Sequence, residues 1–275
     1  MLYVCPTPIG NLEDITLRVL RVLGEVDLIL AEDTRRTAQL LHHFGISKPL
    51  ESFHEHNERS KTEEVLKRLA EGASIALVSD AGMPGISDPG AWLIKQAIEA
   101  NLPCEILPGA NAALVAYLQS GFMSPHFVYY GFLSRKGTVR REELEDLKEL
   151  GYPIIFYESP HRLAATLEDL LACLGDRRAS ISRELTKIFA ETRRGSLAQL
   201  LAFYRENKPR GEFVITVDGA SVQDEKMTED DIIHKLKDLL NSGVSRKTAI
   251  QEISRKYRLP RNQIYEIALR VKPSD

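Results

Sequence analysis

The strongest constraint on the fold of this chain is the alternation of short apolar runs with helix-period stretches over its first 120 residues. The apolar runs are bounded by turn residues, as buried parallel strands are; they are Leu2–Cys5, Val26–Ala31, Ser74–Ser79 and Cys104–Leu107. The stretches between them carry apolar residues at helical spacing; they are Ile15–Leu23, Thr34–Phe44, Ser60–Leu69 and Pro89–Ala100. This alternation predicts an α/β domain over residues 1–120, with an open, largely parallel sheet and helices on both faces.

A second α/β domain is predicted over residues 121–218. Its expected strands are Phe127–Phe132, Ile154–Tyr157, Ala179–Ser182 and Phe213–Val217. Its expected helices are Arg140–Leu150, Pro160–Leu174 and Leu197–Glu206. Ser159 followed by Pro160 predicts a helix N-cap with proline at the first helical position.

The end of the chain has a different character. Residues 219–227 are polar and aperiodic, as linkers are, and three short helices are predicted beyond them at Thr228–Leu240, Ser245–Tyr257 and Pro260–Arg270. Thr228 with Asp231 matches a capping box. We expect residues 226–275 to form a small helical, helix-turn-helix-like tail. The pattern fits two interpretations equally well: a domain that binds nucleic acid, or a helical appendage whose role is limited to packing.

Charge is distributed unevenly along the chain. The whole sequence of 275 residues has 36 Lys and Arg against 39 Asp and Glu, a net charge of −3, which argues against a surface that is basic all over. Residues 226–275 nevertheless carry a net charge of +4, and residues 1–225 carry −7. A basic tail joined to an acidic body allows local contacts to phosphate groups.

Composition also limits the setting of the protein. The three cysteines, Cys5, Cys104 and Cys173, are widely spaced and form no CxxC, so we expect neither a disulfide framework nor a structural zinc site. His54-Glu55-His56 lacks the spacing of a zinc motif, and we expect no metal. No apolar run approaches 18 residues and the first residues do not resemble a signal peptide. We expect a cytoplasmic protein that does not enter a membrane.

Ligands of open parallel sheets bind beyond the carboxyl ends of the strands, so the loops that follow the strands are the candidate site. Three of these loops, Pro6–Leu12, Ser79–Gly90 and Pro108–Ala112, are rich in glycine and proline. The second is longer than a strand-to-helix turn requires. None of them matches the dinucleotide fingerprint or the P-loop, so both of these phosphate-binding devices are excluded.

Charged segments follow other strands. Glu32-Asp33-Thr34-Arg35-Arg36 has two interpretations: a capped helix start, or Asp33 in the crevice with Arg35 and Arg36 facing an anionic substrate. His161-Arg162 and Glu184 to Lys187 close strands of the second domain and would face the same crevice. Glu184 and Lys187 could equally form a local ion pair.

Several strings along the chain match one known family. They are Thr7–Leu12, Asp14–Thr16, Glu32–Arg35, His56–Glu58, Ser79–Gly90, Pro108–Gly109, Gly131–Leu133, Tyr157–Arg162, Arg183–Lys187 and Gly211–Glu212. In these strings the chain resembles the ribosomal RNA small subunit methyltransferase I group of the tetrapyrrole methylase superfamily, over about residues 1–217 and in order. The tail also resembles the small helical domain of that group. The sequence departs from the family pattern at Met83, Asn111 and Ser134, where Thr, Ser and Pro are usual.

The resemblance implies a two-domain class III methyltransferase that uses S-adenosylmethionine, forms a homodimer and needs no metal. The expected reaction is 2′-O-methylation of a cytidine ribose in small-subunit (16S) rRNA, with free rRNA or the 30S subunit as partner. The residues expected at the cofactor are Pro8, Asp80, Ala81, Gly82, Gly85, Ile86, Ser87, Pro108, Ala112, Leu185, Gly211 and Glu212. The residues expected at the RNA are Arg35, Arg36, His161, Arg162, Arg246 and Lys247.

The chemistry of such a transfer sets what the protein must supply. In-line displacement at a sulfonium methyl group depends mainly on alignment of donor and acceptor, which can contribute roughly 7–11 kcal/mol. A ribose hydroxyl must also lose its proton, so a general base or a cationic neighbour should help. Asp33, Glu184 and Lys187 are the candidates.

Two other functions fit part of the pattern. One is methylation of a small, tetrapyrrole-type substrate by the same superfamily, which the basic tail and the Arg35-Arg36 and Arg193-Arg194 pairs disfavour. The other is a helix-turn-helix DNA-binding regulator whose body senses a ligand. The crevice loops and the length of the family match favour an enzyme over the regulator.

Overall fold

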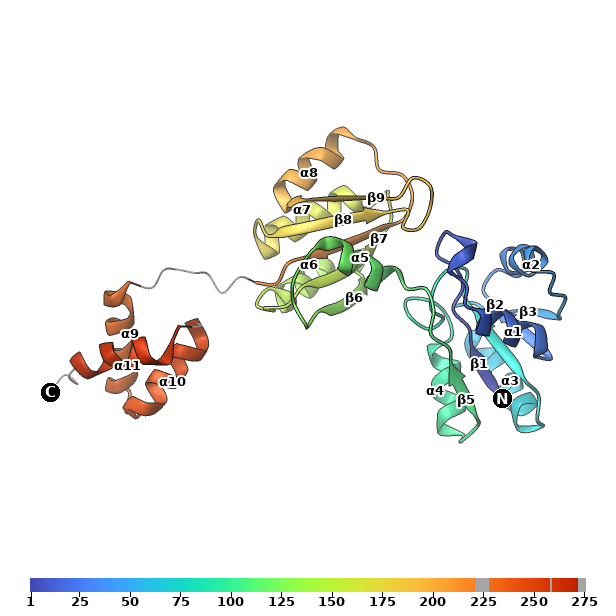
Figure 1. Ribbon diagram of the computed structural model, residues 1–275, viewed down its shortest axis with the longest axis horizontal. Coiled ribbons are helices and arrows are strands. Elements are labelled where there is room, and N and C mark those ends of the chain that lie inside the picture. The colour runs from blue at the N-terminus through green and yellow to red at the C-terminus, as the bar shows by residue number, and fades with distance from the viewer. Residues whose placement is uncertain (221–227, 258, 272–275) are drawn as a thin grey trace. The chain divides into compact units, whose positions relative to one another are not determined.

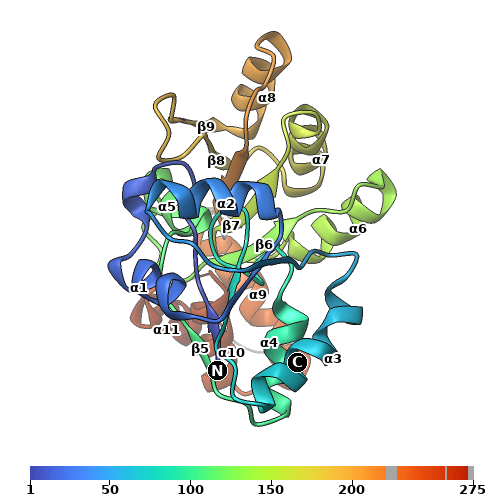
Figure 2. The same cartoon turned by 90° about the vertical axis from the view of Figure 1, so that its right-hand side faces the viewer.

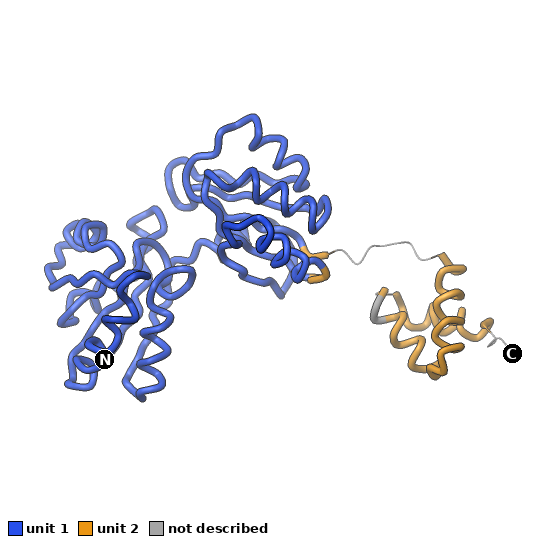
Figure 3. Tube along the Cα trace, turned by 180° about the vertical axis from the view of Figure 1, so that it is seen from behind, with its two compact units in different colours: residues 1–148, 152–218 blue, residues 149–151, 219–275 orange. Residues whose placement is uncertain are grey.

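The computed structural model describes residues 1–220, 228–257 and 259–271. The chain divides into two compact units, which are coloured in Figure 3. Unit 1 is Met1–Lys148 with Tyr152–Asp218, and it contains both sheets; unit 2 is Glu149–Gly151 with Gly219–Asp275. None of the helices in the described part of the chain is long and apolar enough to cross a membrane.

The first sheet is parallel throughout, as predicted. It consists of β1 (Leu2–Val4), β2 (Leu28–Ala31), β3 (Leu50–Ser52), β4 (Ile75–Val78) and β5 (Cys104–Ile106), in the order β3-β2-β4-β1-β5. The sequence did not predict β3, because its three residues are only partly buried and lack an apolar run. The other four strands lie within or beside their predicted ranges.

Helices cover both faces of this sheet (Figure 2). They are α1 (Leu17–Glu25), α2 (Thr34–His43), α3 (Glu58–Ala70) and α4 (Ala91–Glu99), and a 3-10 turn, η1 (Leu12–Asp14), precedes α1. Side chains of α1 and α2, such as Val19 and Leu41, join one apolar core, and side chains of α3 and α4, such as Val65 and Leu93, join the core on the other face. Because β2 and β4 are buried on both faces, they read as continuous apolar runs.

The second sheet is mixed. It consists of β6 (Val128–Phe132), β7 (Ile154–Glu158), β8 (Arg178–Arg183), β9 (Glu191–Ser196) and β10 (Phe213–Val217), in the order β6-β7-β10-β8-β9. Only β6 and β7 pair in parallel. Helix α5 (Ala112–Ser120) covers one face, and α6 (Gly137–Leu147), α7 (Leu163–Leu174) and α8 (Leu197–Glu206) lie on the other, as Figures 1 and 2 show.

The structure corrects the sequence reading of this sheet in three places. The helix α5 and the edge strand β9 were not predicted. The predicted N-cap at Ser159 is wrong, since α7 begins at Leu163 after a turn. In that turn the Ser159 carbonyl accepts the N–H groups of Arg162 at 3.2 Å and Leu163 at 3.1 Å.

Unit 2 holds three helices, α9 (Glu229–Asn241), α10 (Arg246–Tyr257) and α11 (Arg261–Arg270), around an apolar core that includes Leu236, Ile250 and Ile264. The predicted capping box is confirmed: Thr228 Oγ1 accepts the Asp231 N–H at 3.2 Å, and the Asp231 carboxylate accepts the Thr228 N–H at 2.9 Å. Most of the predicted linker, residues 221–227, lies outside the described residues.

Candidate functional site

The loops after β1 and β4 are tied together. Thr7 and Gly82 exchange two backbone hydrogen bonds of 2.9 and 3.0 Å, and Thr7 Oγ1 donates to the Ser79 carbonyl at 3.0 Å. Two of the three glycine- and proline-rich loops therefore form one fixed surface at the carboxyl end of the first sheet.

This surface borders a cavity of about 430 Å³ that loops of both sheets line. Such a volume suits a small organic ligand. Its acidic lining residues are Glu32, Asp80, Asp88, Glu158, Glu184 and Glu212. Its larger apolar lining residues are Ile9, Met83, Ile86, Phe132, Leu185, Phe213 and Val214. A cavity with apolar walls and many carboxylates favours a ligand that is partly apolar and carries positive charge.

Most residues expected at the cofactor lie in the wall of this cavity. Those that line it are Asp80, Ala81, Gly82, Ile86, Ser87, Ala112, Leu185 and Glu212. Pro8, Gly85, Pro108 and Gly211 are not part of the lining. Ala112 is the first residue of α5, and Asn111, which replaces the usual Ser, caps that helix by accepting the Leu114 N–H at 3.2 Å.

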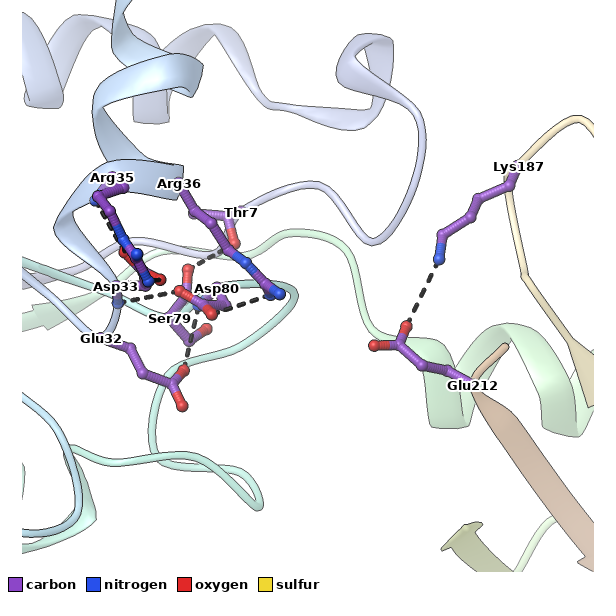
Figure 4. A network of polar contacts seen from close by, with 9 residues as sticks. All are labelled: Thr7, Glu32, Asp33, Arg35, Arg36, Ser79, Asp80, Lys187 and Glu212. Atoms are coloured by element: carbon purple, nitrogen blue, oxygen red, sulfur yellow. Dashed lines mark hydrogen bonds and ion pairs between the residues drawn. The ribbon is translucent and has the colours of Figure 1, made fainter. Parts of the chain in front are cut away.

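Asp80 is the centre of a polar network beneath one side of the cavity (Figure 4). Its carboxylate accepts the Asp33 N–H at 3.0 Å and Arg36 Nη1 at 3.0 Å, and its own N–H donates to Glu32 Oε2 at 3.3 Å. Burial raises the pKa of Glu32, which also faces the negative charge of Asp80. Arg36 is the one residue expected at the RNA that lines the cavity, and its guanidinium is bonded to Asp80.

Asp33 does not have the environment of a general base. The Arg35 side chain donates two hydrogen bonds to the Asp33 carboxylate, from Nε at 3.1 Å and from Nη2 at 2.7 Å, and the Arg35 backbone N–H donates a third at 2.9 Å. The Arg35 guanidinium holds the pKa of Asp33 well below its usual range. Asp33 lies outside the cavity lining and caps α2, so the structure supports the capped helix start over the catalytic interpretation.

Glu184, Lys187 and Glu212 form a second network, on the side of the other sheet. Lys187 Nζ lies 3.0 Å from Glu184 Oε1 and 3.6 Å from Glu212 Oε2, and the latter contact is drawn in Figure 4. Burial works to raise the pKa of Glu184, but hydrogen bonds from Lys187 and the Glu212 N–H lower it overall. The ion pair that the sequence left open as an alternative for Glu184 and Lys187 is present, and of these two residues Glu184 lines the cavity.

Gly211 supports this network without lining the cavity. A Cβ at Gly211 would lie 2.5 Å from Glu184 Oε1, and the backbone there has φ +89°. The Glu184 carboxylate accepts the Glu212 N–H at 3.1 Å. Only glycine allows the chain to pass this close to the carboxylate in this conformation.

Asp88 is a functional candidate that the sequence did not single out. It lines the cavity from the Ser79–Gly90 loop, where burial and then the negative charge of Glu32 raise its pKa to about 7. The sequence showed a loop with two aspartates but gave no signal of which would be buried. A carboxyl group with this pKa can bind and release a proton at neutral pH.

The remaining residues expected at the RNA have mixed environments. Arg162 Nη2 donates to the carbonyls of Leu133 at 2.7 Å and Ser134 at 3.2 Å, so it stabilises the end of β6, and Arg246 Nη2 donates to the Val271 carbonyl at 2.9 Å. Both guanidinium groups have structural partners, which disfavours a primary role at phosphates. His161 and Lys247 are exposed.

The described residues contain no group of three or more His, Cys, Asp or Glu side chains arranged to hold a metal ion.

The sequence and the fold both match known methyltransferases. Residues 1–201 match the family of tetrapyrrole (corrin/porphyrin) methylases. The chain is 43% identical over 274 residues to ribosomal RNA small subunit methyltransferase I of Synechocystis sp., with 99% of this chain and 98% of the relative covered. It is 42% identical over 271 residues to the protein of the same name from Bacillus subtilis, with 97% and 93% covered.

Solved structures with low sequence identity share the fold. The methyltransferase CobJ aligns with a TM-score of 0.61 at 20% identity, over 80% of this chain and 94% of that chain. Uroporphyrin-III C-methyl transferase from Thermus thermophilus, in complex with S-adenyl homocysteine, aligns with a TM-score of 0.59 at 14% identity, over 78% and 96%. The two sheets, the cavity and the near full-length relatives lead to one conclusion: the chain belongs to the tetrapyrrole methylase family and, within it, to the ribosomal RNA small subunit methyltransferase I group.

Proposed function

We propose that the protein transfers a methyl group from S-adenosylmethionine to the rRNA of the small ribosomal subunit, and that the acceptor is the 2′-hydroxyl of a cytidine. The observation that carries the proposal is the similarity of more than 40% identity, over nearly the whole chain, to proteins named for methylation of small-subunit rRNA. The similarity includes the basic tail, which small-molecule methylation does not need.

The cavity has the chemistry that this cofactor requires. S-adenosylmethionine combines an aromatic adenine with a ribose, a sulfonium, and an amino-acid end that has an ammonium and a carboxylate group. The carboxylates of Glu32, Asp80 and Glu212 would balance its positive groups, and apolar side chains such as Ile86 and Leu185 would contact its rings and chain. When bound, the cofactor supplies a methyl group activated by positively charged sulfur.

The residues of the chain then have two tasks at the acceptor. Asp88, with a pKa of about 7, is the lining carboxyl group suited to accept the proton of the ribose hydroxyl. The ammonium of Lys187, positioned by Glu184 and Glu212, would stabilise negative charge that develops on the hydroxyl oxygen. Asp33 keeps a structural role in this scheme.

The decisive experiment measures tritium transfer from labelled S-adenosylmethionine to purified 30S subunits, to naked 16S rRNA and to a tetrapyrrole. Label in rRNA, followed by digestion to nucleosides that yields 2′-O-methylcytidine, supports the whole proposal. Label in rRNA on another atom would leave the rRNA methyltransferase and exclude the 2′-hydroxyl. Label only in the tetrapyrrole would favour a small-molecule enzyme, and label in none would favour a regulator that senses the ligand.

A further inference from the structure

We infer that Phe132 is a stacking platform for the nucleobase of the target nucleotide, at the rim of the acidic cavity. The inference rests on the proposed function and extends it from the class of substrate to the way in which one nucleotide is held. The geometry of β6, the exposure of the ring, and the charge and order of the following segment support it.

A β-bulge directs Phe132 toward the cavity. In the pairing of β6 with β7, Tyr129 is opposite Ile155 but Gly131 is opposite Phe156, so Tyr130 is an extra residue. After the bulge Phe132 is opposite Tyr157, which also lines the cavity.

In regular pairing without a bulge, Phe132 would be opposite Glu158 and would share its face of the sheet, where Glu158 accepts a hydrogen bond from Thr166 of α7 at 2.6 Å. Glu158 also borders the cavity, so the bulge decides which face of β6 carries the ring, and it places Phe132 beside Tyr157. Bulges of this kind re-aim side chains next to functional sites.

The ring of Phe132 is exposed although it lines the cavity. Its relative exposure is 52%. The ring packs edge-on against Tyr157, with 5.6 Å between centroids, and Tyr157 packs against Tyr129 at 5.2 Å. The Tyr129 hydroxyl is in turn 2.7 Å from Ser87 Oγ in the Ser79–Gly90 loop. Phe132 is thus held in place by a row of aromatic residues and still has free surface.

The segment after Phe132 is ordered and basic. Arg162 fixes it through the carbonyls of Leu133 and Ser134. Arg135 and Lys136 follow and are exposed, and neither forms an ion pair with a described residue. An exposed aromatic ring followed by two available cations is the combination that binds unpaired nucleotides, because the cations contact phosphates while a base stacks on the ring.

The proposed reaction is helped by such a device. A nucleotide drawn out of a stacked RNA can present its 2′-hydroxyl to the cavity, and leaving the stack costs a few kcal/mol. Stacking on an aromatic side chain offsets about 1–3 kcal/mol of that cost per base. Phe132 lines the same cavity as Asp88, so a base held on it belongs to a nucleotide at the proposed proton acceptor.

The test compares Phe132→Leu with Phe132→Tyr. Leucine keeps an apolar side chain but removes the stacking face, so the KM for 30S subunits or rRNA should rise between about 5-fold and 150-fold. The Kd for S-adenosylmethionine, measured by calorimetry, should rise much less than the KM for rRNA, and a wild-type far-UV circular dichroism spectrum would show that the variant is folded. Phe132→Tyr should restore the KM, because a tyrosine ring also stacks.

Tyr152→Leu is the matched control. Tyr152 is 44% exposed and lies just before β7, at the end of the sheet opposite to the cavity. Its substitution should leave the KM for rRNA unchanged. Equal increases in KM for Tyr152→Leu and Phe132→Leu would overturn the assignment, as would an unchanged KM in Phe132→Leu while the wild-type protein methylates rRNA. If the wild-type protein transfers no label to rRNA, the proposed function itself fails.

A direct probe of stacking uses the single tryptophan of the chain. Trp92 is replaced by Phe, and Phe132→Trp is added, so that the only indole lies at the rim of the cavity. An unstructured cytidine-containing oligonucleotide should quench its fluorescence, and an abasic oligonucleotide of the same length should not. Equal quenching by both would refute stacking.

Discussion

The ionisation of Asp88 links the candidate site to the stability of the protein. In the native protein the Asp88 carboxyl keeps its proton up to about pH 7, whereas in the unfolded chain it loses the proton near pH 3.9. Between these pH values the native state binds more protons than the unfolded state, so the free energy of unfolding falls as the pH rises. Above pH 7 the destabilisation is complete and constant.

The size of this effect follows from the difference in pKa. Each pKa unit corresponds to about 1.4 kcal/mol. The rise in the pKa of Asp88 from about 4 in the unfolded chain to about 7 in the native protein therefore corresponds to about 4 kcal/mol. Asp88 is only partly buried, and solvent screening reduces this to roughly 2 kcal/mol. Asp88→Asn removes the charge and keeps the size of the side chain. We expect it to stabilise the protein by about 2 kcal/mol at pH 8, or about 4–8 °C in Tm, and to have little effect at pH 4.

The measurement is thermal unfolding of wild type and Asp88→Asn at pH 4, 6 and 8, followed by circular dichroism. Asp146→Asn, at an exposed position on α6, is the control and should show no gain that grows with pH. The reasoning is refuted if the difference in Tm between Asp88→Asn and wild type does not grow from pH 4 to pH 8. The same substitution should lower kcat for methyl transfer, because asparagine cannot accept the proton.

Three further predictions concern other parts of the protein. Lys187→Ala should lower kcat by at least about tenfold with the affinity for S-adenosylmethionine nearly intact, since its proposed role is at the acceptor oxygen and not at the cofactor; an unchanged kcat excludes its role. Gly211→Ala should cost about 1–3 kcal/mol in a urea titration, because its Cβ would lie 2.5 Å from Glu184 Oε1; an unshifted midpoint means that Glu184 moves aside. Removal of residues 228–275 should weaken RNA binding and flatten its dependence on salt, measured by filter binding between 50 and 200 mM salt; an unaltered slope would show that the tail makes no phosphate contacts.

The sequence predicted the strands that are buried on both faces and the helices that have one apolar face. The strands β2 and β4 are apolar runs because both of their faces are covered, and α8 matches its predicted range because it has one apolar face and a capping residue, Ser196. In contrast α5 contains apolar residues on most sides, and β9 has the sequence Glu-Thr-Arg-Arg-Gly-Ser, which carries no apolar alternation. Their structure follows from tertiary partners, and local sequence gives little sign of it.

The candidate site was predictable as a set of loops, but its chemistry depends on contacts across the chain. Asp33 and Asp80 occupy similar positions in the sequence, since each closely follows a strand. Nevertheless the Asp33 carboxylate is hydrogen-bonded to Arg35 outside the cavity lining, whereas Asp80 lines the cavity. Asp80 and Asp88 stand in the same loop, and the loop sequence gives no sign that Asp88 has the raised pKa. The bulge at Tyr130 could not be predicted either, because the extra residue is defined by the pairing of β6 with β7 and has no signal in the local sequence.

The order of the strands also sets when each half of unit 1 can form during synthesis. All strands of the first sheet are present once Ile106 has been made. The second sheet differs, because β10, the last strand in the sequence, lies in the middle and joins β7 to β8. Until Val217 is available, β6 with β7 and β8 with β9 are two separate strand pairs with open edges, and isolated pairs have little stability in water. A nascent chain that stalls shortly before Phe213 would therefore present a folded first domain and an aggregation-prone second one. The second sheet is completed only when its last strand, β10, has been synthesised.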